Sequence, residues 1–190
     1  MTTLVVVKKN GVATLAADTL ARYGSTLEGA DLIANADKIL TFGEAHVAPA
    51  GPASAQLVLR SYFAEEDRTA DFGSLQGVFE TFREMQAVLK DSYYLNPKED
   101  EGDPFDSLQM ELLVASPAGI FGVYPLRSVQ EYNHFYAFGS GASYALGALH
   151  ALYDQMESSE ELARQAVAAA ARFDDSSALP VTHRSVKLWD

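Results

Sequence analysis

The sequence has 190 residues, of which 48% are hydrophobic and 21% charged, so it is long enough to bury a sizeable core and has a globular composition. The absence of cysteine excludes disulfides, a thiol nucleophile and cysteine-based zinc sites. The formal net charge of −12 disfavours nucleic acid as a partner, because such binding depends on neutralising phosphates.

No apolar run reaches the ~20 residues that span a bilayer. No basic segment followed by an apolar stretch has the pattern of a signal peptide. We therefore expect a cytoplasmic protein without a membrane partner.

The first part of the chain predicts two β-hairpins. Asn10-Gly11 is a strong hairpin-turn signal between two runs of β-forming residues. Residues 19–36, which lie between the hairpins, favour a loop or a short extended excursion. The strands expected here are 3–8, 12–17, 38–42 and 45–48.

The remainder of the chain predicts four helices and further strands. Residues 75–94 give the clearest helix, because their apolar residues recur every three or four positions in one stripe. Residues 95–107 are acidic and contain proline, so we expect a loop insertion. The other helices are expected at 55–65, with Ser54 as the N-cap, at 140–156 and at 159–172, and the strands at 108–115, 119–124, 132–138 and 179–188.

The order of these elements indicates the fold class. Strands and helices come in blocks, which favours an α+β protein over alternating βαβ units. Two antiparallel sheets packed face to face, each covered by a pair of helices, would bury every apolar face. No repeat and no boundary is visible, so we expect a single domain over 1–190.

The start of the chain carries candidate chemistry. A threonine hydroxyl is a weak nucleophile that needs a base beside it. A threonine at a free N-terminus has its own base, because the α-amine has a reference pKa of about 7.7–8.0. Met1 stands before a small residue, so its removal would expose Thr2. A Met-Thr start is common by itself, and the prediction depends on residues further along the chain.

Four segments, in chain order, resemble a known protein family. They are Thr2–Val7 with Asn10-Gly11 and Ala16-Ala17-Asp18, then Ala36–Ile39, Phe138–Gly147, and Ala166–Ala170 running on to Asp174–Ser177. Each is weak alone, but together they extend over the whole chain. The sequence resembles the β-subunit-type threonine proteases of the proteasome, closest to the bacterial HslV group or a related bacterial proteasome homologue. The resemblance implies the N-terminal nucleophile hydrolase fold, a four-layer αββα sandwich.

The resemblance also implies the roles of the main site residues. Thr2 would be the nucleophile and its α-amine the base. Lys38 would lower the pKa of that amine by like-charge repulsion and help the hydroxyl to lose its proton. Asp18 would pair with Lys38, and Ser140 would hydrogen-bond the terminal amine.

Further residues would support this centre. Asp174 and Ser177 match a pair that positions the terminus and Ser140. The backbone N–H of Gly51 is the candidate oxyanion donor, although Pro52 beside it lacks an N–H. No cofactor is required, but family members often hold a monovalent or divalent cation through backbone carbonyls. The matching positions are Ala171, Asp174 and Ser177.

Each of these residues also has a purely structural interpretation. A lysine at a strand start is often solvated, and Asp18 could simply form a turn. Gly139-Ser140-Gly141 could be a helix N-cap or a phosphate cradle, but a dinucleotide fingerprint requires a βαβ unit that is not expected here.

The resulting hypothesis is a self-compartmentalising threonine endopeptidase. Unfolded polypeptide would bind as an added strand beside 19–23. The family implies a homo-oligomeric double ring of twelve or fourteen subunits, with an AAA+ unfoldase as a possible partner and the loop 95–107 near the axial pore. The alternatives are a non-proteolytic N-terminal nucleophile amidohydrolase and a catalytically silent ring scaffold.

Overall fold

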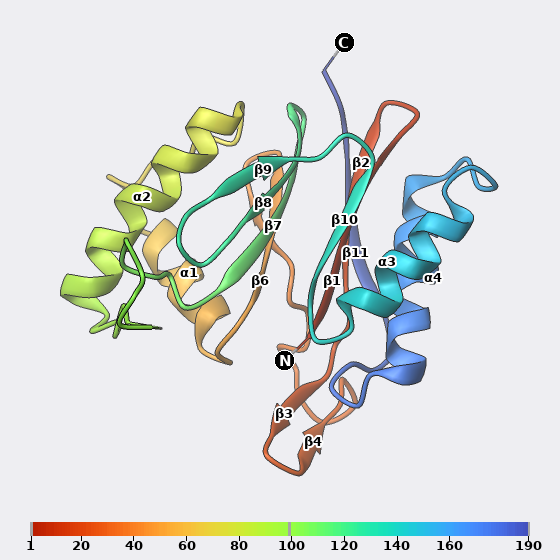
Figure 1. Cartoon of the computed structure of the whole chain (residues 1–190), viewed down its shortest axis with the longest axis horizontal. Coiled ribbons are helices and arrows are strands. Elements are labelled where there is room, and N and C mark those ends of the chain that lie inside the picture. The colour runs from red at the N-terminus through yellow and green to blue at the C-terminus, as the bar shows by residue number, and fades with distance from the viewer. Residues whose placement is uncertain (1, 99, 190) are drawn as a thin grey trace.

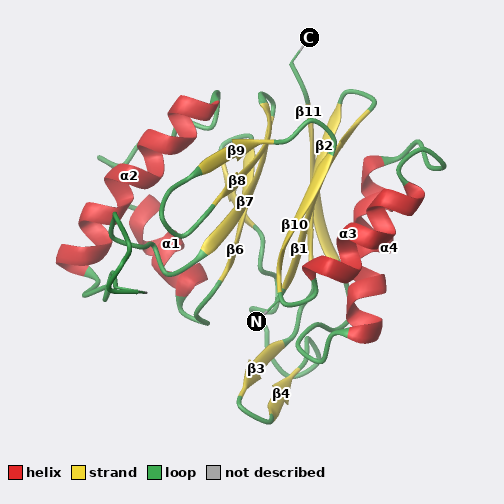
Figure 2. Ribbon diagram, in the orientation of Figure 1, coloured by secondary structure: helices red, strands yellow, loops and turns green. Residues whose placement is uncertain are grey.

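The computed structural model describes residues 2–98 and 100–189, which form four stacked layers. Two sheets lie face to face in the middle, and a pair of helices covers the outer face of each (Figure 1, Figure 2). This is the αββα sandwich that the sequence predicts, so the expected α+β class is confirmed. None of the helices in the described part of the chain has the length and apolar character needed to cross a bilayer.

The first sheet has the strand order β10-β1-β2-β11 with antiparallel pairing throughout. Its outer face is covered by α3 and α4. These elements are β1 (Thr3–Lys9), β2 (Val12–Ala17), β10 (Phe135–Gly139), β11 (Thr182–Lys187), α3 (Ala142–Leu152) and α4 (Ser159–Phe173).

The second sheet has the order β5-β6-β7-β8-β9 and is covered by α1 and α2. A separate two-stranded hairpin, β3 and β4, lies at the end of the molecule where the chain begins (Figure 1). These elements are β3 (Ala21–Tyr23), β4 (Thr26–Glu28), β5 (Leu40–Phe42), β6 (Ala45–Ala50), α1 (Ala55–Phe63), α2 (Leu75–Ser92), β7 (Glu111–Ser116), β8 (Gly119–Val123) and β9 (Val129–Glu131).

Three apolar cores hold the layers together, and the alternation along β1 shows how one strand serves two of them. Leu4 and Val6 pack between the two sheets, whereas Val5 and Val7 pack against the outer helices. Successive side chains of a strand point to opposite faces. All four are fully buried, so β1 is apolar on both faces and cannot move without disrupting both cores.

Several element boundaries differ from those expected. The stretch 19–36 contains the hairpin β3–β4, and β9 was not predicted. The strand expected at 132–138 is β10, which pairs with β1 at the sheet edge. The apolar stripe of α2 is narrower than predicted, because Leu75 is 41% exposed. Ser54 precedes α1 as expected, but its side chain makes no capping hydrogen bond.

The acidic segment 95–107 follows α2, on the side of the molecule that α1 and α2 cover (Figure 1). Its base is closed by a hydrogen bond of 2.8 Å from Ser107 N to the Pro97 carbonyl. The Lys90 ammonium also pairs with the Asp106 carboxylate at 2.6 Å. Glu99, one of its predicted acidic residues, lies outside the described residues, as does Met1.

Candidate active site

Thr2 lies directly before β1 and is only 4% exposed. Its hydroxyl contacts a lysine and a carboxylate at once. The Lys38 ammonium donates to Thr2 Oγ1 at 2.5 Å, and the Thr2 hydroxyl donates to Asp18 Oδ1 at 2.5 Å. These two charged residues lie 16 and 36 positions further along the chain and meet the threonine only in the folded structure.

Asp18 is fully buried at the end of β2 and fixes the start of the chain. Its Oδ1 accepts from Thr3 N at 2.9 Å and from Lys38 Nζ at 2.7 Å. Its Oδ2 accepts from Leu20 N at 2.9 Å and Ala178 N at 3.3 Å. With the Thr2 hydroxyl, five donors surround this one carboxylate and hold it in a fixed position.

Lys38 connects the two sheets, because it precedes β5 of one sheet and reaches the carboxylate that ends β2 of the other. Its side chain is 11% exposed. Burial lowers the pKa of Lys38, and the attraction of Asp18 opposes this only in part. The neighbouring Asp37 anchors the same segment, accepting from Ile39 N at 3.0 Å and pairing with Arg184 at 2.7 Å.

A second polar network supports the backbone at the start of β1. Ser140 donates to Asp174 Oδ2 at 2.9 Å, and Ser177 donates to the same oxygen at 2.6 Å. Since Ser177 gives its proton to Asp174, the 2.6 Å contact between Thr3 Oγ1 and Ser177 Oγ has Thr3 as donor. Ser140 also lies 3.3 Å from the Thr2 carbonyl oxygen. The expected bond from Ser140 to the Thr2 nitrogen is not among the hydrogen bonds of the described residues.

The two glycines that flank Ser140 are required by close packing. A Cβ on Gly139 would lie 2.1 Å from the Thr2 carbonyl oxygen, and its φ of +93° is unfavourable for other residues. A Cβ on Gly141 would lie 2.1 Å from Thr3 Oγ1 and 2.9 Å from Ala170 Cβ. The Gly-Ser-Gly motif therefore lets β10 approach the first two threonines. The motif also contains the N-cap residue of α3, Gly141, as one structural interpretation predicted, although no side chain caps the helix there.

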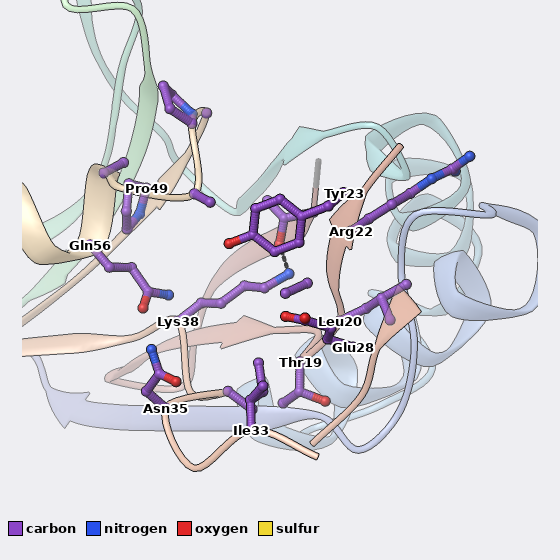
Figure 3. A pocket seen from close by; sticks show the side chains of 17 residues that line it. Thr19, Leu20, Arg22, Tyr23, Glu28, Ile33, Asn35, Lys38, Pro49 and Gln56 are labelled. Atoms are coloured by element: carbon purple, nitrogen blue, oxygen red, sulfur yellow. Dashed lines mark hydrogen bonds between the residues drawn. The ribbon is translucent and has the colours of Figure 1, made fainter. Parts of the chain in front are cut away.

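A cavity of about 180 Å³ opens beside the Thr2 hydroxyl (Figure 3). One wall is β3, and Lys38 crosses the middle. Gly51, the predicted oxyanion donor, lines the same cavity just after β6. A Cβ there would lie 2.9 Å from Met110 Cβ, so the backbone of Gly51 is held close against the neighbouring chain segment. Gly51 and Thr2 therefore line the same cavity.

One connection at the site was missed from the sequence. Arg22 on β3 pairs with Asp175 at 2.7 Å and donates to Ser176 Oγ at 2.9 Å, while its Nε donates to the Gly24 carbonyl at 2.8 Å. These contacts tie the hairpin wall to the turn that carries Asp174 and Ser177. Charged residues far apart in sequence gave no local signal for this pairing.

The fold and the site together define a class. A threonine at the start of a central strand, bonded to a buried lysine and aspartate within an αββα sandwich, defines an N-terminal nucleophile hydrolase whose nucleophile is threonine. The arrangement places a hydroxyl and a buried ammonium group together beside a cavity.

Comparison with known proteins identifies the family. The structure of Thiobacillus denitrificans BPH has 41% sequence identity and a TM-score of 0.92, with 98% of each chain covered. That of Thiobacillus denitrificans BPH in complex with epoxomicin has 40% identity and a TM-score of 0.92, covering 99% of this chain and 100% of the other. The chain therefore belongs to the bacterial proteasome β-type family, as the resemblance predicted, and is a threonine protease.

A more distant structure shows the same fold. Eukaryotic HslV from Trypanosoma brucei has a TM-score of 0.71 at 18% identity, covering 97% of this chain and 99% of the other. No protein-family model and no curated protein sequence matches the chain.

Proposed function

We propose that the mature chain, after loss of Met1, is an endopeptidase that cleaves unfolded polypeptide with Thr2. The observation that carries the proposal is the 2.5 Å contact from Lys38 Nζ to Thr2 Oγ1, beside the carboxylate of Asp18. The Lys38 ammonium beside this oxygen favours the negative charge that develops when the hydroxyl loses its proton.

The reaction follows from this geometry. The α-amine of Thr2 accepts the hydroxyl proton, and Oγ1 attacks the peptide carbonyl carbon. Lys38 stabilises the developing alkoxide, and the N–H of Gly51 faces the oxyanion. The amine returns the proton to the leaving nitrogen as the C–N bond breaks, which leaves an ester on Thr2. Water then hydrolyses the ester and restores the hydroxyl.

The hairpin β3–β4 offers a place for an extended substrate. Within the described residues, β3 pairs only with β4, so the other edge of β3 has no strand partner. Residues 21–23 line the cavity beside Thr2. An added substrate strand would form main-chain hydrogen bonds to this edge, which supports the predicted role of 19–23.

The assembly is part of the same proposal. We infer a homo-oligomeric double ring of twelve or fourteen subunits with the sites inside, in the cytoplasm, and a AAA+ unfoldase as a possible partner. The acidic segment 95–107 is proposed to lie near the axial pore. Native mass spectrometry tests the ring, since twelve or fourteen copies give distinct masses and a monomer or dimer would favour a small-amide hydrolase.

A structural cation beyond α4 also remains a proposal. Carbonyl oxygens suit hard cations, and the Ala171 carbonyl lies in the last turn of α4, where carbonyls lack intrahelical partners. The Asp174 carbonyl accepts from Ser177 N at 3.4 Å and keeps a second lone pair. The described residues include no group of three acidic or histidine side chains that could hold a metal, so any cation would depend on the carbonyls.

Intact mass before and after incubation with a peptide epoxyketone tests the catalytic proposal. The reagent needs both the threonine hydroxyl and a free α-amine to form its ring adduct. We expect a chain without Met1 that gains one inhibitor mass. A chain that retains Met1 and stays unmodified after assembly would favour the silent scaffold, and a Met-free chain that ignores the reagent would favour another amidohydrolase or an inactive homologue.

A further inference from the structure

The cavity beside Thr2 has an unbalanced charge. Three charged side chains line it, namely Arg22, Glu28 and Lys38. Both cations have a carboxylate partner at 2.7 Å, Asp175 for Arg22 and Asp18 for Lys38. The Glu28 carboxylate has no hydrogen bond or ion pair within residues 2–98 and 100–189.

The position of Glu28 follows from the small hairpin. Glu28 ends β4 and lies opposite Ala21 of β3, the strand that walls the cavity. Glu28 is one of the side chains that line the cavity (Figure 3). An anion here has little compensation from neighbouring charges, so it favours a cation in the space beside the nucleophile.

The rest of the lining suits a long cationic side chain. The amides of Asn35 and Gln56 flank the cavity, and neither has a hydrogen-bond partner in the described part of the chain (Figure 3). The ring of Tyr23 lies over the cavity, where an aromatic face attracts cations. Leu20 and Ile33 provide apolar surface for an aliphatic stem.

The size of the cavity limits what enters it. A volume of about 180 Å³ is below the ~300–1,000 Å³ of typical small-molecule pockets, so it fits one side chain of an extended peptide. Because Thr2 lines the cavity, that side chain belongs to the residue whose carbonyl is attacked.

We propose that the protease cleaves after basic residues, lysine or arginine, and that Glu28 determines this specificity. The inference rests on the proposed function, because it names the substrate class of the same site. The head of arginine or lysine would pair with the Glu28 carboxylate and donate to the free amide oxygens. An acidic residue would be repelled by the Glu28 carboxylate. A leucine would form no hydrogen bond with Glu28, Asn35 or Gln56.

The test compares fluorogenic peptides that differ only at the cleaved residue, with arginine, leucine or glutamate. Rates are normalised to active sites titrated with an epoxyketone. For the unaltered protein we expect arginine to exceed the other two in kcat/KM. For Glu28→Gln, kcat/KM on arginine should fall about 10- to 100-fold, as for loss of a hydrogen bond to a charged group, with leucine unchanged.

Asp31→Asn is the matched control. It removes the same charge three positions along the chain, at an exposed residue that does not line the cavity. We expect this variant to keep the arginine preference. If Glu28→Gln and Asp31→Asn shift the preference equally, the effect comes from net charge and the role of Glu28 is refuted.

A second measurement does not depend on a variant that folds. The unaltered protein is labelled with two epoxyketones that end in arginine or in citrulline, its uncharged analogue. Labelling at least about tenfold faster by the arginine reagent supports the charge recognition. Equal labelling rates with the two reagents refute the charge recognition and leave the proposed catalysis intact. If neither reagent labels the protein and a leucine epoxyketone also fails to label it, the catalytic proposal is refuted.

Discussion

Replacing Asp18 by asparagine should remove the carboxylate that pairs with Lys38. The carboxylate is fully buried and accepts from Lys38 Nζ at 2.7 Å. An amide of the same shape keeps one acceptor oxygen and turns an NH₂ group toward a set of donors. Breaking a buried ion pair in this way costs about 3–5 kcal/mol, because a charge stays buried without its partner.

The loss should depend on pH with a definite sign. The folded-state pKa of Lys38 is already below its usual value because of burial, and loss of Asp18 lowers it further. Between the folded and unfolded pKa values the unfolded chain binds more protons, so stability rises with pH. The penalty of Asp18→Asn should therefore be larger at pH 6 than at pH 9, because it shrinks as the pH rises through the lowered pKa toward that of a free lysine.

Urea unfolding at fixed subunit concentration, at pH 6 and pH 9, measures both quantities. Asp37→Asn is the control, because it makes the same substitution in an ion pair whose side chains are 45% and 34% exposed. Such a pair contributes about 0–1 kcal/mol. A loss below about 1 kcal/mol for Asp18→Asn, or one that grows with pH, would refute the reasoning on the buried pair.

The site supports three further predictions. Gly141→Ala places a methyl group 2.1 Å from Thr3 Oγ1 and should lower the free energy of unfolding by about 1–3 kcal/mol. Gly147→Ala is the control, because Gly147 has open space around it in α3, and it should be neutral or stabilising. Thermal unfolding of both variants measures the difference. Ser177→Ala leaves Thr3 Oγ1 and the Asp174 carboxylate without their shared partner and should slow epoxyketone labelling while the assembled mass stays unchanged. Shortening 95–107 should change the turnover of unfolded protein more than that of a short peptide, and equal turnover of both would count against a place near the pore.

Much of the fold was predictable because local patterns specify it. β-branched runs around Asn10-Gly11 gave the first hairpin, since a tight turn and period-two alternation are properties of adjacent residues. The helix α2 was predictable from its 3.6-residue apolar period. The hairpin β3–β4 was predicted only as a loop or a short extended excursion. Its strands are three residues long and none of their residues is fully buried, so burial left no pattern in the sequence.

Segments that resemble a known family predicted a centre built from Thr2, Asp18 and Lys38. The environment of these side chains could not be predicted in the same way, because it depends on tertiary packing. Thr3 and Ser177 are 174 positions apart and share a hydrogen bond because β1 lies beside the turn after α4. The lowered pKa of Lys38 depends on what surrounds its side chain. So does the Glu28 carboxylate, which meets no partner among the described residues. Burial and charge pairing depend on side chains that come from distant segments of the chain, and a local sequence pattern does not show which of them become neighbours.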